Sequence, residues 1–338
     1  MARYSLIVAA LLSLLITAVS GFFILPWLKK LHYGQNIKEI GPTWHSKKQG
    51  TPMMGGLMFI LGSVVATGVA YATLTTAQPD LLGGLSAQQG RTLLFCMLAT
   101  FGFCFVGFVD DYLKVVHKQN TGLSARLKIV MQTIVAAAFL ASLQLNGVLS
   151  TTVSFPIFGR WEMGLLYWPF AFLMILGFVN AVNLTDGLDG LASSVTFIVM
   201  LGYMTVATLL GYYALGIFGA AVAGGCAGFL FWNFYPAKVF MGDTGSMYLG
   251  GAVVTISFGI GRPELLFLLG ILYLIEAASV VIQVTYFKIT HGKRIFKMTP
   301  IHHHFEMCGW SEVKIFTVFV SVTVAMCVLA WFGVRYRY

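Results

Sequence analysis

The sequence predicts an all-α protein that crosses a membrane about ten times. Hydrophobic residues make up 58% of the 338 positions and charged residues 10%, whereas about a quarter of an ordinary soluble domain is charged. Long stretches carry no charge, and a helix needs about 20 apolar residues to cross the hydrocarbon layer. These stretches do not alternate between polar and apolar residues, as the strands of a membrane β-barrel do. We therefore expect a single integral-membrane domain over residues 1–338.

The charge-free runs place the individual helices. The run 190–237 has 48 residues, which is enough for two crossings, and we divide it near Gly211. The stretch 151–159 has strand-like composition and predicts a short hairpin outside the membrane. The expected spans lie within 4–28, 53–79, 92–109, 129–159, 163–185, 190–237 (two spans), 244–261, 265–287 and 315–334.

Lysine and arginine predict the orientation, because short cytoplasmic loops of membrane proteins are enriched in them. If the loop after the first span is cytoplasmic, the inner loops hold 15 of the 21 basic residues, including every lysine. Both termini and the hairpin would then be periplasmic. The same bias, together with anionic lipid, accounts for the net charge of +9 without a nucleic-acid partner.

Two adjacent carboxylates, Asp110 and Asp111, follow the run 92–109 directly. A carboxylate near the end of a span is costly unless it faces water, a cation or a pocket, and two neighbouring carboxylates repel each other. A solvated loop start is the structural alternative. Because Lys114 follows three residues later, we favour a functional site at the cytoplasmic end of this span.

Two further polar clusters lie at span ends on the same predicted side. Segment 180–190 contains two asparagines and two aspartates, which is dense for helix capping alone. Asp243 stands between glycine and Thr-Gly-Ser. It either forms an Asx turn that caps the next helix or binds a metal beside backbone amides that bind phosphate. Clustered carboxylates with basic loops suit Mg²⁺ and a polyphosphate, because Mg²⁺ takes few protein oxygens and fills its shell with phosphate and water.

The last basic loop contains three consecutive histidines, His302, His303 and His304. Adjacent histidines cannot easily all bind one ion, so phosphate binding or acid–base chemistry suits them better than zinc binding. Glu276 is the only charged residue well inside a predicted span. It either pairs within the bundle or lines a groove.

Four ordered motifs carry a resemblance to a known family. They are Asp110-Asp111-x-x-Lys114, Asn180-x-x-Asn183-x-x-Asp186-Gly-x-Asp189-Gly, Phe240-Met-Gly-Asp243-Thr-Gly-Ser and Pro300-Ile-His302-His303-His304-Phe-Glu. The chain resembles the polyprenyl-phosphate N-acetylhexosamine-1-phosphate transferases along its whole length, and the last motif resembles the members that use a muramoyl-pentapeptide. Met53 departs from the family, which usually has threonine there, and this affects only a polar contact.

The resemblance implies Mg²⁺-dependent transfer of phospho-MurNAc-pentapeptide from UDP to undecaprenyl phosphate in the bacterial inner membrane, giving UMP and lipid I. It also implies a homodimer. Use of UDP-N-acetylglucosamine is the alternative activity. A secondary transporter fits less well, because the acidic residues lie at the inner surface and not at mid-membrane.

By position, the resemblance implies a role for each motif residue. Asp243 would bind Mg²⁺, and Asp110 and Asp111 would orient or activate the lipid phosphate, with His302 and His303 as further catalytic residues. A phosphate monoester is mostly dianionic at neutral pH, so we favour direct attack over a covalent phospho-enzyme. The implied substrate contacts are Lys47, Lys114, Lys128, Asn180, Asn183, Asp186, Asp189, Asn233, Phe240, Gln283 and His304.

Overall fold

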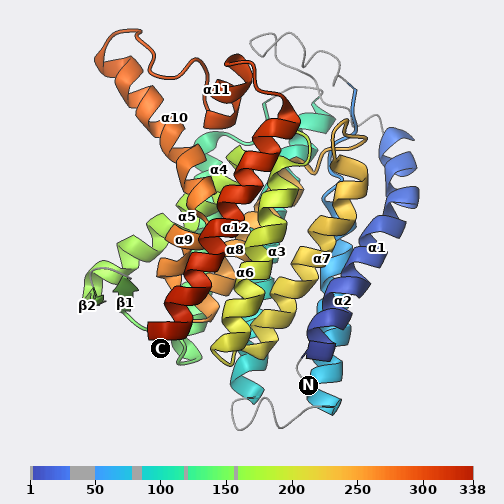
Figure 1. The fold of residues 1–338 in the computed structure, drawn as a ribbon, viewed down its shortest axis with the longest axis vertical. Helices are drawn as coiled ribbons and strands as arrows, with labels where there is room; N and C mark the ends of the chain where they lie inside the picture. Colours follow the sequence, from blue (N-terminus) through green and yellow to red (C-terminus); the bar gives the residue numbers. More distant parts are fainter. Residues whose placement is uncertain (1–2, 31–49, 78–85, 118–120, 156–158, 338) are drawn as a thin grey trace.

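A bundle of long helices makes up nearly all of the described structure (Figure 1). The computed structural model describes residues 3–30, 50–77, 86–117, 121–155 and 159–337. Its elements, in chain order, are α1 (Arg3–Lys30), α2 (Leu57–Ala77), α3 (Ser86–Val116), α4 (Ala125–Leu145), β1 (Thr152–Phe155), β2 (Gly159–Glu162), η4 (Gly164–Leu166), α5 (Tyr167–Thr185), α6 (Leu191–Leu209), α7 (Tyr213–Asn233), α8 (Gly242–Gly259), η5 (Pro263–Leu265), α9 (Leu266–Leu269), α10 (Ile271–Ile289), α11 (Ile301–Met307) and α12 (Glu312–Arg337).

Within these ranges, nine helices are long and apolar enough to cross a membrane: α1 to α7, α10 and α12. Their outward faces carry large exposed apolar side chains, such as Leu15 and Phe22 on α1 and Leu98 and Phe105 on α3. Exposed apolar surface on this scale is stable against lipid chains but not against water. The chain is therefore an all-α polytopic membrane protein, and the predicted fold class is confirmed.

Helix α8 corresponds to the eighth expected span, and it lies inside the bundle. Every residue of α8 except Asp243 is buried. Its polar side chains bond to neighbouring helices: the hydroxyls of Thr255 and Thr100 lie 3.1 Å apart, and those of Tyr248 and Ser63 lie 2.7 Å apart. A helix surrounded by protein does not need the wide apolar surface that lipid requires, so α8 can carry glycine, serine and threonine throughout.

Helix α3 continues beyond the charge-free run 92–109 and ends at Val116. Asp110 and Asp111 are therefore on a helical face, where they are only 4% and 1% exposed. The alternative interpretation of these residues as a solvated loop start is wrong. Lys114, one turn after Asp110, lies with its Nζ 2.6 Å from the Asp110 carboxylate, and such pairs stabilise the helix across the polar segment.

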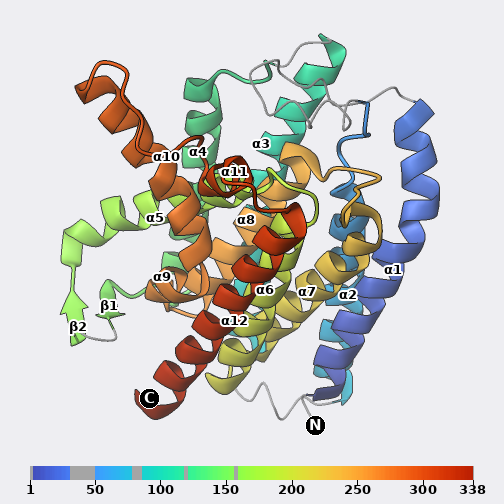
Figure 2. The ribbon, with the colours of Figure 1, turned by 45° about the horizontal axis from the view of Figure 1, so that its top comes forward.

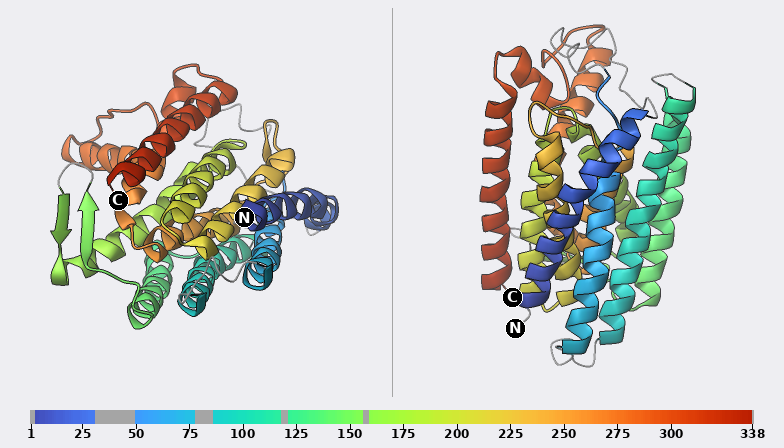
Figure 3. Two further views of the ribbon diagram at one scale, coloured as in Figure 1. Left: turned by 60° about the horizontal axis from the view of Figure 1, so that its bottom comes forward. Right: turned by 90° about the vertical axis from the view of Figure 1, so that its right-hand side faces the viewer.

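Two features interrupt the bundle. Strands β1 and β2 form the predicted antiparallel hairpin, which leads into α5 (Figure 1). The ninth expected span is broken at Gly270 into α9 and α10. Figure 2 shows α10 tilting outward from the bundle and α11 lying over the end of the bundle. Figure 3 shows the beginning of α1 and the end of α12 at one end of the molecule, with α11 at the other.

Candidate active site

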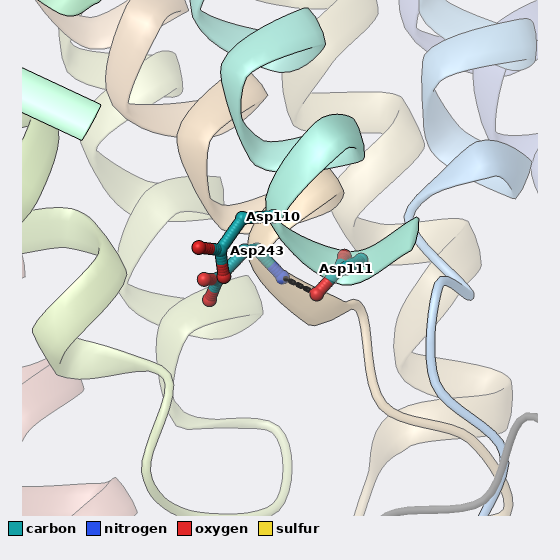
Figure 4. A group of neighbouring side chains, drawn as sticks. All are labelled: Asp110, Asp111 and Asp243. Atoms are coloured by element: carbon teal, nitrogen blue, oxygen red, sulfur yellow. Dashed lines mark hydrogen bonds between the residues drawn. The ribbon is translucent and has the colours of Figure 1, made fainter. Parts of the chain in front are cut away.

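Three aspartates from two helices meet at the end of the bundle that carries α11 (Figure 4). Asp110 and Asp111 come from α3 and Asp243 from the first turn of α8, and one carboxylate oxygen of each lies within 4.8 Å of the others. The two helices approach closely here, because a Cβ added to Gly107 of α3 would lie 2.2 Å from the carbonyl oxygen of Asp243. Glycine at position 107 thus permits the approach that brings the three carboxylates together.

Asp111 binds the start of α8. Its carboxylate accepts hydrogen bonds from the backbone N–H groups of Asp243 (3.1 Å) and Thr244 (2.8 Å) and from the Thr244 hydroxyl (2.7 Å). The first N–H groups of a helix have no partner within it, and the helix dipole favours a negative charge beside them. Asp111 therefore caps α8 from another helix. The alternative in which Asp243 itself caps α8 through an Asx turn is not observed.

The Asp243 side chain turns away from α8 and toward three other helices. Lys114 Nζ and Lys128 Nζ donate to its Oδ2 at 2.9 and 3.0 Å, and Asn183 Nδ2 donates to its Oδ1 at 2.8 Å. Asn183 also donates to Ser246 Oγ at 2.7 Å. Residues from α3, α4 and α5 thus converge on one carboxylate. The structure brings together the predicted metal ligand and three of the predicted substrate contacts.

The Asp110 carboxylate lies beside that of Asp243 and also holds the segment before α4. Its Oδ1 accepts a hydrogen bond from the Leu123 N–H at 2.8 Å. A Cβ added to Gly122 would lie 2.6 Å from this oxygen, so the loop passes close over Asp110. Lys114 is shared, because its Nζ also lies 3.8 Å from an oxygen of Asp111. One ammonium group therefore contacts all three aspartates.

A fourth acidic group, Asp186, lies beside the cluster and responds to its negative charge. Asp186 follows α5, and burial together with the carboxylates of Asp243 and Asp111 raises the pKa of Asp186 to about 8. Two lysines contact the three aspartates, so the carboxylates outnumber the ammonium groups. Mg²⁺ prefers carboxylate oxygens. The carboxylate of Asp111 accepts hydrogen bonds from the start of α8, whereas the carboxylates of Asp243 and Asp110 do not. This donor set fits a divalent cation.

Segment 50–56 packs on the segment that leads into α8. The Phe240 N–H donates to the Pro52 carbonyl at 2.8 Å, and the Gly55 N–H donates to the Phe240 carbonyl at 2.8 Å. Helix α2 begins only at Leu57, after this segment. These bonds place Phe240, a predicted substrate contact, three residues before Asp243 with its side chain half-buried.

Two predicted substrate contacts are engaged by protein partners within the bundle. Asn180 Nδ2 donates to Gln132 Oε1 at 2.7 Å, which joins α5 to α4. Buried Asn233 accepts from the Gly190 N–H at 3.2 Å and donates to the Val239 carbonyl at 2.9 Å. Both asparagines therefore hold helices and loops around the aspartate cluster, and their contact with substrate stays a prediction.

Two other predicted contacts fix loops. Asp189 accepts a hydrogen bond from the Ala237 N–H at 2.9 Å, which joins the loop after α5 to the loop after α7. Gln283 accepts from the Phe296 N–H at 2.8 Å and so holds the segment between α10 and α11. Lys47, another predicted contact, lies outside the described residues.

The three histidines lie on α11 and have different surroundings. His303 Nδ1 lies 2.6 Å from Glu306 Oε2, and His304 Nδ1 accepts a backbone N–H from the preceding segment. His302 is fully buried, with its Nδ1 3.0 Å from Glu276 Oε2. Of the two alternatives for Glu276, pairing within the bundle is confirmed. The sequence contained one signal for this pair, a charge deep within a span, but nothing that identified the partner.

Comparisons with known proteins find similar sequences along nearly the whole chain. A family model described as Glycosyl transferase family 4 matches residues 93–260, which contain the three aspartates. The chain is 42% identical over 324 residues to a phospho-N-acetylmuramoyl-pentapeptide-transferase of Clostridium botulinum (strain Alaska E43 / Type E3), covering 96% of this chain and 94% of the relative. It is 43% identical to the protein of that name from Clostridium perfringens (strain 13 / Type A), covering 96% and 98%, and 41% identical to that from Acetivibrio thermocellus, covering 97% and 95%.

Proposed function

The chain belongs to the family of phospho-N-acetylmuramoyl-pentapeptide-transferases, and from this premise we propose that it transfers phospho-MurNAc-pentapeptide from UDP to undecaprenyl phosphate. The products would be UMP and lipid I. The observation that carries the proposal is the convergence of Lys114, Lys128 and Asn183 on Asp243 at one end of a bundle of apolar helices. A lipid acceptor and a charged diphosphate donor can meet only where apolar and charged surfaces adjoin.

In the proposed reaction, an oxygen of the lipid phosphate attacks the phosphorus that carries the sugar. A new bond forms between this oxygen and phosphorus, the bond between the two phosphates of UDP breaks, and UMP leaves with the electron pair. One diphosphate replaces another, so the reaction needs no additional energy source. Because the second pKa of a phosphate monoester is about 6, the acceptor needs positioning more than deprotonation.

The described residues would have separate roles in this reaction. Asp243, with Asp110 beside it, would bind Mg²⁺, which supplies positive charge to stabilise the charge that develops on the diphosphate. Lys114 and Lys128 would donate to phosphate oxygens, and Asp110 would position the acceptor. Asp111 would support the site by holding the start of α8. The remaining proposed substrate contacts are Lys47, Asn180, Asn183, Asp186, Asp189, Asn233, Phe240, Gln283 and His304, and His302 and His303 are proposed as further catalytic residues.

We also propose that the aspartate cluster faces the cytoplasm and that both termini are periplasmic. The support is the distribution of lysine and arginine among the loops. Single-cysteine variants of a chain without its other cysteines test this. A cysteine at exposed Ser150, near the hairpin, should react with an impermeant maleimide in intact cells, whereas exposed Cys308 should react only after permeabilisation. The opposite pattern would invert the topology. The homodimer stays a prediction.

Release of UMP by the purified protein tests the activity. We expect UDP-MurNAc-pentapeptide with undecaprenyl phosphate and Mg²⁺ to give UMP, and UDP-N-acetylglucosamine to give none at a comparable rate. Without the lipid acceptor no UMP should appear, because direct attack requires the acceptor. Equal rates with both UDP-sugars would overturn the muramoyl assignment, and a stoichiometric burst without lipid would indicate a phospho-enzyme.

A further inference from the structure

Glu276 and His302 form a buried pair, and the reaction described above gives Glu276 no role. Glu276 is on α10 and His302 on α11, both are 0% exposed, and Nδ1 of the histidine lies 3.0 Å from Oε2 of the glutamate. A carboxylate at this distance favours a proton on Nδ1 and fixes the ring orientation. The pair therefore determines which ring nitrogen of His302 is directed away from α10.

The other ring nitrogen is buried without a partner. His302 Nε2 and Glu276 Oε1 have no hydrogen-bond partner among the residues that the structure describes. Nε2 faces Gly187, where an added Cβ would lie 2.2 Å from it. Any side chain at position 187 would collide with this nitrogen, so glycine allows the loop to pass this close to the ring.

This arrangement does not stabilise the fold well. A buried pair of polar groups must offset the desolvation of both, and it does so only when the remaining polar atoms are also bonded. Here one polar atom of each partner is left over. A buried polar atom without a partner is uncommon in native proteins and points to a ligand or a functional role.

The position of Gly187 connects the pair to the aspartate cluster. Gly187 follows Asp186, whose carboxylate interacts electrostatically with those of Asp243 and Asp111. One turn earlier, Asn183 donates directly to Asp243. His302 Nε2 is thus directed at the loop that borders the cluster.

We propose that Glu276 is a positioning residue for phosphoryl transfer. It holds His302 so that Nε2 faces the loop at Gly187, and Nε2 binds an anionic group of the substrate. The inference rests on the proposed function, because it assigns the ligand of Nε2 to the diphosphate donor or the phosphate acceptor. Glu276 itself does not touch the substrate. Its effect on the rate passes through the His302 ring.

The test measures kcat and KM by UMP release, and thermal unfolding in detergent, for Glu276→Gln alone and combined with His302→Ala. Glu264→Gln is the matched control, because Glu264 is also a buried glutamate, paired with Arg262 at the other end of the bundle. We expect Glu276→Gln to lower kcat about 10- to 100-fold with less than about a threefold change in KM, as loss of a partner that orients a ligating histidine does. In the His302→Ala background the same change should lower kcat less than about twofold, because no ring remains to be positioned.

Three kinetic outcomes would overturn the inference. They are an unchanged kcat in folded Glu276→Gln, an equal loss in the presence and absence of His302, and a loss that merely follows a fall in stability shared with Glu264→Gln. Protein labelled with ¹⁵N-histidine gives a readout that needs no substrate. The His302 signal, identified by its loss in His302→Ala, should show a protonated Nδ1, and Glu276→Gln should mix the tautomers. An unprotonated Nδ1 in the unmodified protein would also overturn it, whereas failure of UDP-MurNAc-pentapeptide to react would count against the proposed function alone.

Discussion

Replacement of Asp243 by asparagine is expected to lower the rate of UMP release about 100-fold or more without unfolding the protein. The carboxylate of Asp243 is the group on which Lys114, Lys128 and Asn183 converge. An asparagine has similar size but no charge, so it would bind a divalent cation weakly and would no longer neutralise the two lysines. The fold should persist, because Asp111 and not Asp243 holds the start of α8.

The measurement is the UMP release rate as a function of Mg²⁺ concentration, together with thermal unfolding in detergent. Glu162→Gln is the control, because it makes the same change of acid to amide at an exposed position on the hairpin. The control should retain the full rate. A well-folded Asp243→Asn protein with near-normal turnover and Mg²⁺ dependence would remove Asp243 from the proposed metal site.

Asparagine substitutions at Asp110 and Asp111 are expected to have different effects, although the two residues are adjacent. Asp111 is buried and accepts three hydrogen bonds from Asp243 and Thr244, so the loss of its charge should destabilise the protein by about 3 kcal/mol. For a chain of this size, that corresponds to a fall in unfolding temperature of about 5–10 °C. Activity should fall with it, because α8 carries Asp243.

Asp110→Asn should instead lower the rate at least about 10-fold with a smaller fall in unfolding temperature. The oxygen of an asparagine can still accept the hydrogen bond from the Leu123 N–H, and Lys114 keeps Asp243 as a partner. The two variants are compared by thermal unfolding and by the rate of UMP release at a temperature where both are folded. If both unfold like the unmodified protein and lose activity equally, then Asp111 acts on substrate and not as a cap.

The features that the sequence alone determined are those that depend on neighbouring residues. The span positions followed from the length of charge-free runs, because a helix must present apolar side chains to lipid over about 20 residues. A hairpin at 151–159 followed from local strand composition, although its second strand lies at 159–162 and extends beyond the predicted stretch. The residue types suited to a cation and phosphate, among them Asp110, Lys114 and Asp243, followed from motifs only a few residues long.

The tertiary structure decided which of these residues act on one another. Asp111 and Thr244 are 133 positions apart, and no local spacing shows that the first caps the helix of the second. In the same way, nothing in the neighbourhood of Glu276 identifies His302 as its partner. Hydrogen bonds and charge pairs between helices depend on which faces pack together, and packing is set by the whole bundle. The sequence could therefore supply the chemical groups of the site, while only the fold could separate those that face the cluster from those that hold it in place.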